Sequence, residues 1–211
     1  VYNPIEFGST KRNGRSSLCA ELNLPAGTPL VGTACRIARQ KNPQSLARAI
    51  GLTLTRAPQA HGIVIGTGSP DAVAEMKSII DECGVSPRVH WLGYRVDAPE
   101  LISQLSIFVI TSYWEGLPTT LLEAMSQKTP IAFLRGKGGL EDLDELNRAE
   151  GPIAAVADTV AELTDGIVAN LDNPAAMQEM AERAFEVGKR HFDVQAVALK
   201  LEKFYCEVMS K

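Results

Sequence analysis

Short apolar segments alternate with amphipathic segments through most of the chain. The apolar segments lack the period-two alternation of half-exposed strands, which is typical of parallel strands covered on both faces. On this basis we predict six buried strands, at residues 28–34, 61–65, 88–92, 106–110, 130–134 and 152–156. Because helical segments lie between these strands, the pattern predicts an α/β fold, a Rossmann-like doubly wound parallel sheet with flanking helices.

Apolar residues recur at helical spacing around the predicted strands. The predicted helices span residues 14–22, 43–56, 71–83, 99–105, 116–127, 159–171, 174–189 and 193–209. Ser69 and Pro70 are favourable at the start of the third helix. We expect one domain over residues 1–211, with residues 1–27 as a lead-in and 193–211 as a terminal helix. The apolar stripe of the terminal helix consists of Val197, Leu201, Phe204, Tyr205 and Val208.

Composition and charge argue against several classes of protein. The 211 residues include 21 Lys and Arg against 25 Asp and Glu, a net charge of −4, whereas nucleic-acid binding needs a basic surface. No apolar run approaches the ~20 residues of a transmembrane helix, so we expect no membrane span, and we also expect no signal peptide. The 4 cysteines and 3 histidines are scattered, so we expect buried, reduced thiols and no metal site.

A few conspicuous residues have a simple structural interpretation. We expect Trp91 and Phe108 to be core residues in strands, and His90 to be half-buried. The acidic residues at 141–145 are interpreted as a solvated helix face rather than a metal site. Gly138-Gly139 could contact a bound sugar, but the favoured interpretation is that these glycines make no such contact.

Ligands of an open parallel sheet bind outside the carboxyl ends of its strands, so the loops there carry the candidate chemistry. The loop after the first strand contains Arg36, Arg39 and Lys41, which could neutralise a pyrophosphate, although a solvated basic loop is the alternative. The next loop, at residues 66–68, has only half of a dinucleotide-binding fingerprint because Asp71 occupies the third glycine position. A tight turn is the commoner explanation, and a nicotinamide enzyme is disfavoured.

The segment at residues 112–125 is the most informative. Glu115 directly follows a strand, Gly116 permits close approach of the backbone to a ligand, and Pro118 suits a first helical turn. The next backbone N–H groups would face a pocket at the positive end of the helix dipole. Glu123 follows Glu115 by eight residues, about 12 Å along a helix. The alternative is one half-buried and one exposed glutamate without a role in binding.

Together these segments resemble the C-terminal, nucleotide-sugar-binding domain of retaining GT-B glycosyltransferases of family 4, the glycosyl transferases group 1. The resemblance covers nearly the whole chain, and its combination of motifs is more specific than any one of them. The matching segments are Tyr2-Asn3-Pro4, Leu22-Asn23-Leu24-Pro25, the loop from Arg36 to Asn42, Gly66-Thr67-Gly68, residues 89–93 and the Glu115-x7-Glu123 segment at 112–130. The implied architecture is one half of a GT-B fold.

The resemblance implies a role for each matched position. Arg36 and Lys41 would neutralise the diphosphate leaving group, and Glu115 would hydrogen-bond the donor sugar; these three are the expected catalytic residues. The expected donor-binding residues are Gly66, Tyr94, Arg95, Gly116, Leu117, Pro118, Thr119, Thr120 and Glu123. The co-substrate would be a UDP- or GDP-linked sugar, with no metal and no other cofactor.

Within the donor site, the resemblance assigns different parts of the nucleotide to different loops. The amides of Thr119 and Thr120 would bind the phosphates, Glu123 the ribose hydroxyls, and the loop at Tyr94 and Arg95 would lie against the base. Charge stabilisation by arginine and lysine is consistent with catalysis without a metal ion.

The chain departs from the family pattern at three places. Cys35 occupies a position before the loop arginine that is often glycine. Gly116-Leu117-Pro118 replaces the commoner Gly-Phe-Gly, and Lys128 or Thr129 replaces a glycine after the helix. A residue other than glycine in a left-handed cap costs about 1 kcal/mol.

The implied reaction is transfer of a hexose from a UDP- or GDP-sugar to an acceptor hydroxyl with retention of configuration. A glycan, lipid or small-molecule acceptor would bind through an N-terminal domain that this chain lacks, so we expect donor binding with little or no turnover. The terminal helix would pack on that domain. The expected location is the cytoplasm, with peripheral attachment to the inner membrane left open for the full-length enzyme. The alternative is a non-catalytic nucleotide-binding or protein-interaction module on the same fold.

Overall fold

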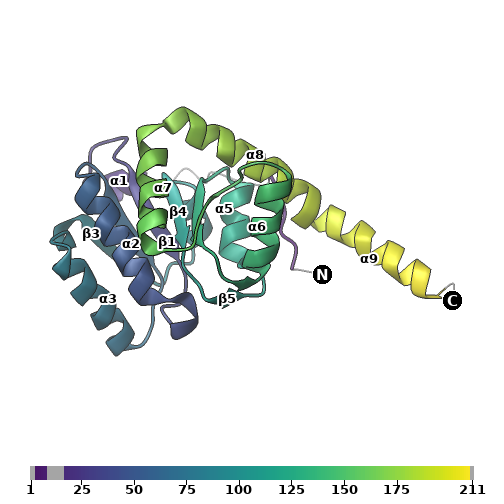
Figure 1. Ribbon diagram of the computed structural model, residues 1–211, viewed down its shortest axis with the longest axis horizontal. Helices are drawn as coiled ribbons and strands as arrows, with labels where there is room; N and C mark the ends of the chain where they lie inside the picture. Colours follow the sequence, from purple (N-terminus) through teal and green to yellow (C-terminus); the bar gives the residue numbers. More distant parts are fainter. Residues whose placement is uncertain (1–2, 9–16, 210–211) are drawn as a thin grey trace.

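The computed structural model describes residues 3–8 and 17–209, and its centre is a six-stranded parallel sheet (Figure 1). The strands are β1 (Leu30–Ala34), β2 (His61–Ile65), β3 (Val89–Gly93), β4 (Ile107–Ile110), β6 (Ile131–Leu134) and β8 (Ala155–Ala157). Their order is β3-β2-β1-β4-β6-β8, which confirms the predicted doubly wound sheet. The order reverses between β1 and β4, and ligands of such sheets bind at that point, outside the carboxyl ends of the strands.

Helices cover both faces of the sheet. They are α1 (Leu18–Glu21), α2 (Pro43–Arg56), α3 (Pro70–Glu82), α4 (Ala98–Ile102), α5 (Thr119–Ser126), α6 (Gly139–Ala149), α7 (Val160–Asp172), α8 (Pro174–Phe192) and α9 (Val194–Met209), with 3-10 turns at Arg39–Lys41 and Ser86–Arg88. The core on one face is shared with α2, α3 and α7, and that on the other with α4, α5, α6 and α8. Phe108 and Val109 of β4 are fully buried on opposite faces, because successive strand residues point in opposite directions.

Local capping signals account for the starts of two helices. The Ser69 side chain accepts a hydrogen bond from the Ala72 N–H at 3.3 Å, and Pro70 is the first residue of α3, as predicted. Asn42 precedes α2 in a left-handed conformation, and its side chain accepts a hydrogen bond from the Ser45 N–H at 3.4 Å. Both caps satisfy N–H groups that have no partner inside the helix.

The start of α5 differs from the prediction. The helix begins at Thr119 rather than at residue 116, because Trp114–Glu115 forms a short strand, β5. This strand pairs in parallel with β7 (Lys137–Gly138). Two-residue strands are too short for a periodic pattern, so the sequence did not predict this second sheet. It brings the segment after β6 against the segment after β4.

The last strand of the main sheet also begins later than predicted, at Ala155 rather than at residue 152. The N–H groups of Ile153 and Ala154 donate to the Asn147 side chain at 2.8 and 3.0 Å. These two residues are buried. Their donors therefore bond to α6 instead of extending the ladder with β6.

The interpretations of two single residues, Asp144 and Trp91, require correction. Asp144 is not part of a solvated face, because it is 3% exposed and its carboxylate accepts hydrogen bonds from Arg135 and Arg148. Trp91 is only half-buried and lies beneath the Lys77 ammonium, whereas Phe108 is fully buried as predicted.

The sequence suggested buried thiols. The cysteines are free, but none of them is fully buried. Cys206 is exposed, and the other three are half-buried. Cys206 belongs to α9, which extends away from the body of the domain (Figure 1). Its exposure follows from the position of that helix.

The terminal helix α9 leaves most of its apolar stripe uncovered. Val197 is buried near its start, but Phe204, Tyr205 and Val208 are 58%, 61% and 55% exposed. The lead-in lies at the base of the helix, where the Ile5 N–H donates to the Phe192 carbonyl at 3.2 Å. Tyr2 and residues 14–16 of the predicted first helix lie outside the described residues. No helix in the described part of the chain has the length and apolar character to cross a membrane.

Candidate functional site

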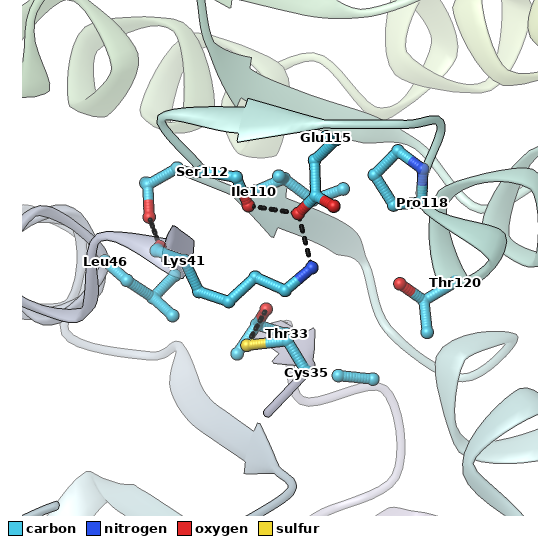
Figure 2. A pocket seen from close by; sticks show the side chains of 11 residues that line it. Thr33, Cys35, Lys41, Leu46, Ile110, Ser112, Glu115, Pro118 and Thr120 are labelled. Atoms are coloured by element: carbon cyan, nitrogen blue, oxygen red, sulfur yellow. Dashed lines mark hydrogen bonds and ion pairs between the residues drawn. The ribbon is translucent and has the colours of Figure 1, made fainter. Parts of the chain in front are cut away.

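A pocket lies at the reversal point of the sheet, outside the carboxyl ends of β1 and β4. Its lining residues are Thr33, Ala34, Cys35, Lys41, Leu46, Ile110, Thr111, Ser112, Glu115, Pro118 and Thr120. Figure 2 shows the Lys41 side chain extending across this pocket toward Glu115, with Thr120 on the far side. Four residues that the sequence predicted for the site thus share one pocket: Lys41, Glu115, Pro118 and Thr120.

The centre of the pocket is an ion pair between the Lys41 ammonium and Glu115 Oε1. The Ser112 hydroxyl donates to the same oxygen at 2.6 Å. The Glu115 side chain is only 7% exposed and that of Lys41 is 21% exposed. A buried carboxylate is costly without hydrogen-bonding partners, and the lysine and the serine supply them.

Lys41 is held in place by the loop that carries Glu115. The buried Thr111 hydroxyl donates to the carbonyl groups of Lys41 at 3.0 Å and Asn42 at 3.1 Å. The Tyr113 N–H donates to the Gln40 carbonyl at 2.9 Å. The loops after β1 and β4 therefore form one hydrogen-bonded unit, which no pattern in the sequence indicated.

Cys35 contributes a thiol to the pocket near Lys41 (Figure 2). Burial raises the pKa of Cys35, and the nearby Lys41 charge opposes that shift only in part. The thiol is therefore more strongly protonated at neutral pH than a free cysteine. This group acts in the pocket as a neutral, weakly polar wall.

Arg36 is exposed next to the pocket and lies outside its lining. Among the described residues it has no side-chain hydrogen bond or ion pair. Arg36 follows the lining residue Cys35, and its exposed guanidinium can bind an anion without breaking an existing contact.

Gly66 fills a space that no other residue could occupy. Its φ is +123°, and a Cβ there would lie 1.9 Å from the Cys35 carbonyl oxygen. The Gly66 N–H also donates to the Gly93 carbonyl at 2.7 Å. The glycine therefore joins the loops after β1, β2 and β3, which agrees with the tight-turn interpretation of residues 66–68.

The first turn of α5 carries the predicted amide donors. The Pro118 carbonyl accepts hydrogen bonds from the N–H groups of Leu121 and Leu122, at 3.0 and 3.2 Å. The N–H groups of Thr119 and Thr120 precede these and have no acceptor within the helix. Gly116 and Leu117 form the loop before the turn, and space around the Gly116 Cα is open. This end of the helix therefore favours an anion beside Lys41.

Glu123 lies one turn further along α5 and is not part of the pocket lining. It is half-buried, and burial raises the pKa of its carboxyl group. Among the described residues its carboxylate has no hydrogen-bonding side chain. Glu115 and Glu123 therefore differ: the first is held by neighbours, and the second is free to bind a ligand.

The loop after β3 places its two predicted residues in different environments. Tyr94 is 76% exposed. The Arg95 guanidinium is bound to Asp97 at 2.8 and 2.9 Å and to Glu21 at 2.6 Å. These two carboxylates raise the pKa of Arg95 above its usual value. Arg95 thus ties the loop to α1, so its predicted contact with a base would require a change of partners.

A third segment, at residues 136–139, supports the site from the side of β6. A Cβ on Gly136 would lie 2.4 Å from the Ser112 carbonyl oxygen, and one on Gly138 would lie 2.3 Å from that of Glu115. From the sequence, this segment was expected at most to contact a bound sugar. Its density of glycines was the signal that a backbone packs closely against it.

Within the described residues, no cluster of three or more His, Cys, Asp or Glu side chains could hold a metal ion.

The sequence model of the glycosyl transferases group 1 matches residues 15–187, and the chain belongs to this family. It is 30% identical to a D-inositol 3-phosphate glycosyltransferase of Arthrobacter sp. over 90% of this chain and 45% of that protein. It is 22% identical to the lipopolysaccharide core biosynthesis mannosyltransferase LpsB of Rhizobium meliloti, over 89% of this chain and 54% of that protein.

Solved structures share the fold. The structure of HepE from Anabaena in complex with UDP and glucose matches 90% of this chain and 51% of that chain, with a TM-score of 0.76 and 23% identity. The C-terminal domain of LpcC from Francisella tularensis matches 83% of this chain and 91% of that chain, with a TM-score of 0.68 and 20% identity. The chain spans 28% to 54% of the length of the first three curated relatives.

Proposed function

We propose that the chain is the donor-binding half of a retaining family 4 glycosyltransferase that transfers a hexose from a UDP- or GDP-sugar to an acceptor hydroxyl. The observation that carries the proposal is the Lys41–Glu115 ion pair, which lies beside the N-terminus of α5 at the reversal point of the sheet. Family membership and the fold of the UDP complex of HepE support it.

Donor binding would rearrange the ion pair. The diphosphate would take the Lys41 ammonium as a partner, with the exposed Arg36 and the free amides of Thr119 and Thr120 around it. The Glu115 carboxylate, released from lysine but still bonded to Ser112, would accept hydrogen bonds from the sugar hydroxyls. Glu123 would bind the ribose, and Tyr94 would lie against the base.

Catalysis would depend on stabilising the leaving group. As the bond between the sugar and the diphosphate breaks, negative charge grows on the phosphate oxygen. Lys41 and Arg36 would bring positive charge to that oxygen, and the α5 N-terminus would supply fixed donors; such groups stabilise a transition state strongly. The acceptor oxygen would bond to the anomeric carbon on the face that the leaving group vacates, and the hydroxyl proton would pass to the leaving phosphate oxygen, so the configuration is retained.

The acceptor site is proposed to belong to a second domain. The exposed apolar stripe at Phe204, Tyr205 and Val208 of α9 supports this proposal, because a helix with such a face gains stability from a partner surface. The limited share of each relative's length that the chain spans supports it as well. This chain alone is therefore expected to bind donor with little turnover, and robust transfer by these residues would contradict the proposal.

The test is isothermal titration calorimetry of the chain with UDP and with GDP, in the absence of metal. We expect one nucleotide to bind, and Glu123→Ala and Arg36→Ala each to weaken that binding at least tenfold. Glu179→Ala, which removes an exposed glutamate of α8, is the matched control and should bind as the wild type does. A folded wild-type chain that binds neither nucleotide would contradict the proposal and favour a non-catalytic module.

A further inference from the structure

Gln40 contacts three consecutive residues of the loop that carries Glu115. Its carbonyl accepts a hydrogen bond from the Tyr113 N–H at 2.9 Å. Its side-chain amide donates to the Trp114 carbonyl at 2.8 Å and to Glu115 Oε2 at 3.4 Å. One residue next to Lys41 therefore holds both the backbone and the carboxylate of the opposite loop.

The two carboxylate oxygens of Glu115 have different partners. Oε1 accepts from Ser112 and is paired with Lys41, whereas Oε2 accepts from Gln40. If Lys41 turns toward a diphosphate, Ser112 and Gln40 remain, one on each oxygen. Two bonds to different oxygens fix the plane of a carboxylate, whereas a single bond leaves it free to rotate.

On the side of Gln40, the Glu115 loop is otherwise held by Thr111, whose hydroxyl donates to the carbonyl groups of Lys41 and Asn42. β5 is only two residues long, and its pairing with β7 lies on the other side of the strand from Gln40. Nothing lies within 4 Å of the position that a Cβ on Gly116 would occupy. The amide of Gln40 adds a bond to the Trp114 carbonyl, and among the described residues it is the one donor to Glu115 Oε2.

We propose that Gln40 is a positioning residue for recognition of the donor sugar: it orients the Glu115 carboxylate toward the hydroxyl groups of a nucleotide-linked pyranose. This inference rests on the proposed function. The inference goes beyond the proposed function because it assigns a role in sugar recognition to a side chain that would contact neither the diphosphate nor the sugar.

The experiment compares calorimetric affinities for UDP and UDP-glucose in the wild type and in Gln40→Met, which keeps the length of the side chain and removes its amide. If GDP is the nucleotide that binds, GDP and GDP-mannose replace them. We expect the affinity for the nucleotide to stay within about twofold, and the gain in affinity from the sugar to fall about fivefold, because a hydrogen bond to a charged group is lost.

Gln44→Met is the matched control. Gln44 is also a glutamine near the start of α2, but its amide donates to the exposed Glu75 at 3.1 Å, away from the pocket. The same substitution there should leave both affinities unchanged. Thermal unfolding of each variant verifies that it is folded, and Gln40→Glu, which replaces the donor by an acceptor, serves as a second variant.

A double-mutant cycle separates positioning from a general structural effect. In a Glu115→Ala background, adding Gln40→Met should cause no further loss of the sugar-dependent gain. An unchanged gain in Gln40→Met, an equal loss of affinity for nucleotide and sugar nucleotide, or a further loss in the Glu115→Ala background would each overturn the inference. A wild type that binds neither nucleotide would instead refute the proposed function, and one that binds both forms equally would refute the role of Glu115.

Discussion

Lys41 and Glu115 are 74 positions apart in the sequence, and they form an ion pair in which the carboxylate is the more deeply buried partner. The Glu115 side chain is 7% exposed, against 21% for Lys41. Removing either partner therefore leaves a different charge in a different environment. The loss of stability should depend on which residue is changed.

We predict that Lys41→Met destabilises the chain more than Glu115→Gln does. Methionine leaves a buried carboxylate with only Ser112 and Gln40, at a cost of about 2 kcal/mol. Glutamine leaves an ammonium that can turn toward water, at a cost of about 1 kcal/mol. Chemical denaturation measures both, and the double variant should recover part of the loss. Equal losses in the two single variants would contradict the assignment of burial.

The Arg95 cluster should show a similar asymmetry. Arg95→Met removes one charged partner of Asp97, whose side chain is 7% exposed, and should cost about 2 kcal/mol of unfolding free energy. Glu21→Gln changes a carboxylate that is 40% exposed and should cost less than about 1 kcal/mol. Denaturant titration of both variants measures this difference. If Glu21→Gln proved the costlier change, Arg95 would be serving α1 rather than the loop after β3.

The paired histidines predict a fall in stability at mildly acidic pH. His61 Nδ1 lies 2.9 Å from His90 Nε2, and the rings are stacked. Burial lowers the pKa of both groups; Arg88 lowers that of His61 further, and His61 lowers that of His90. The unfolded chain therefore binds more protons than the folded chain does. The contribution of the His61–His90 pair to folding stability is present above the unfolded pKa of about 6.5 and is lost as the pH falls below it.

The measurement is the free energy of unfolding at pH 7 and at pH 5. His90→Phe keeps a ring in place and removes one titrating group, so its stability should fall less over this range than that of the wild type. His191→Gln, at the third histidine, is the comparison variant. A pH dependence in His90→Phe equal to that of the wild type would show that the pair does not titrate as stated.

Lys128 ends α5 in a left-handed conformation, with a φ of 56°. Lys128→Gly should be more stable than Lys128→Ala by about 1 kcal/mol, because glycine adopts this conformation without a steric cost. Both variants lose the exposed ion pair with Glu182, which contributes little. Thermal and denaturant unfolding of the two variants isolate the backbone effect. Equal stabilities would mean that the left-handed cap is not strained.

Much of the fold follows from local properties of the sequence. The six strands were predictable because each is a short, mostly apolar segment without period-two alternation, and the start of α3 because Ser69 and Pro70 act within one helical turn. The placement of Lys41, Glu115 and Thr120 at one edge follows from the parallel order of the strands. The strands and the helix start depend on residues close to one another in the chain, whereas the shared edge follows once the strands are parallel.

Tertiary structure decided which charged side chains pair with one another. Asp144 looked like a surface acid, and only its contacts with Arg135 and Arg148 account for its burial. Arg95 follows a strand, as a ligand-binding arginine would, but Glu21 and Asp97 occupy its guanidinium.

The short strands β5 and β7 and the contacts of Gln40 carry no periodic signal. They arise because the fold brings segments from separate strand ends together. The sequence by itself determined which elements form and which chemical groups reach the edge of the sheet. The pairing of those groups depends on distances between remote segments, and only the packed sheet and helices set these distances.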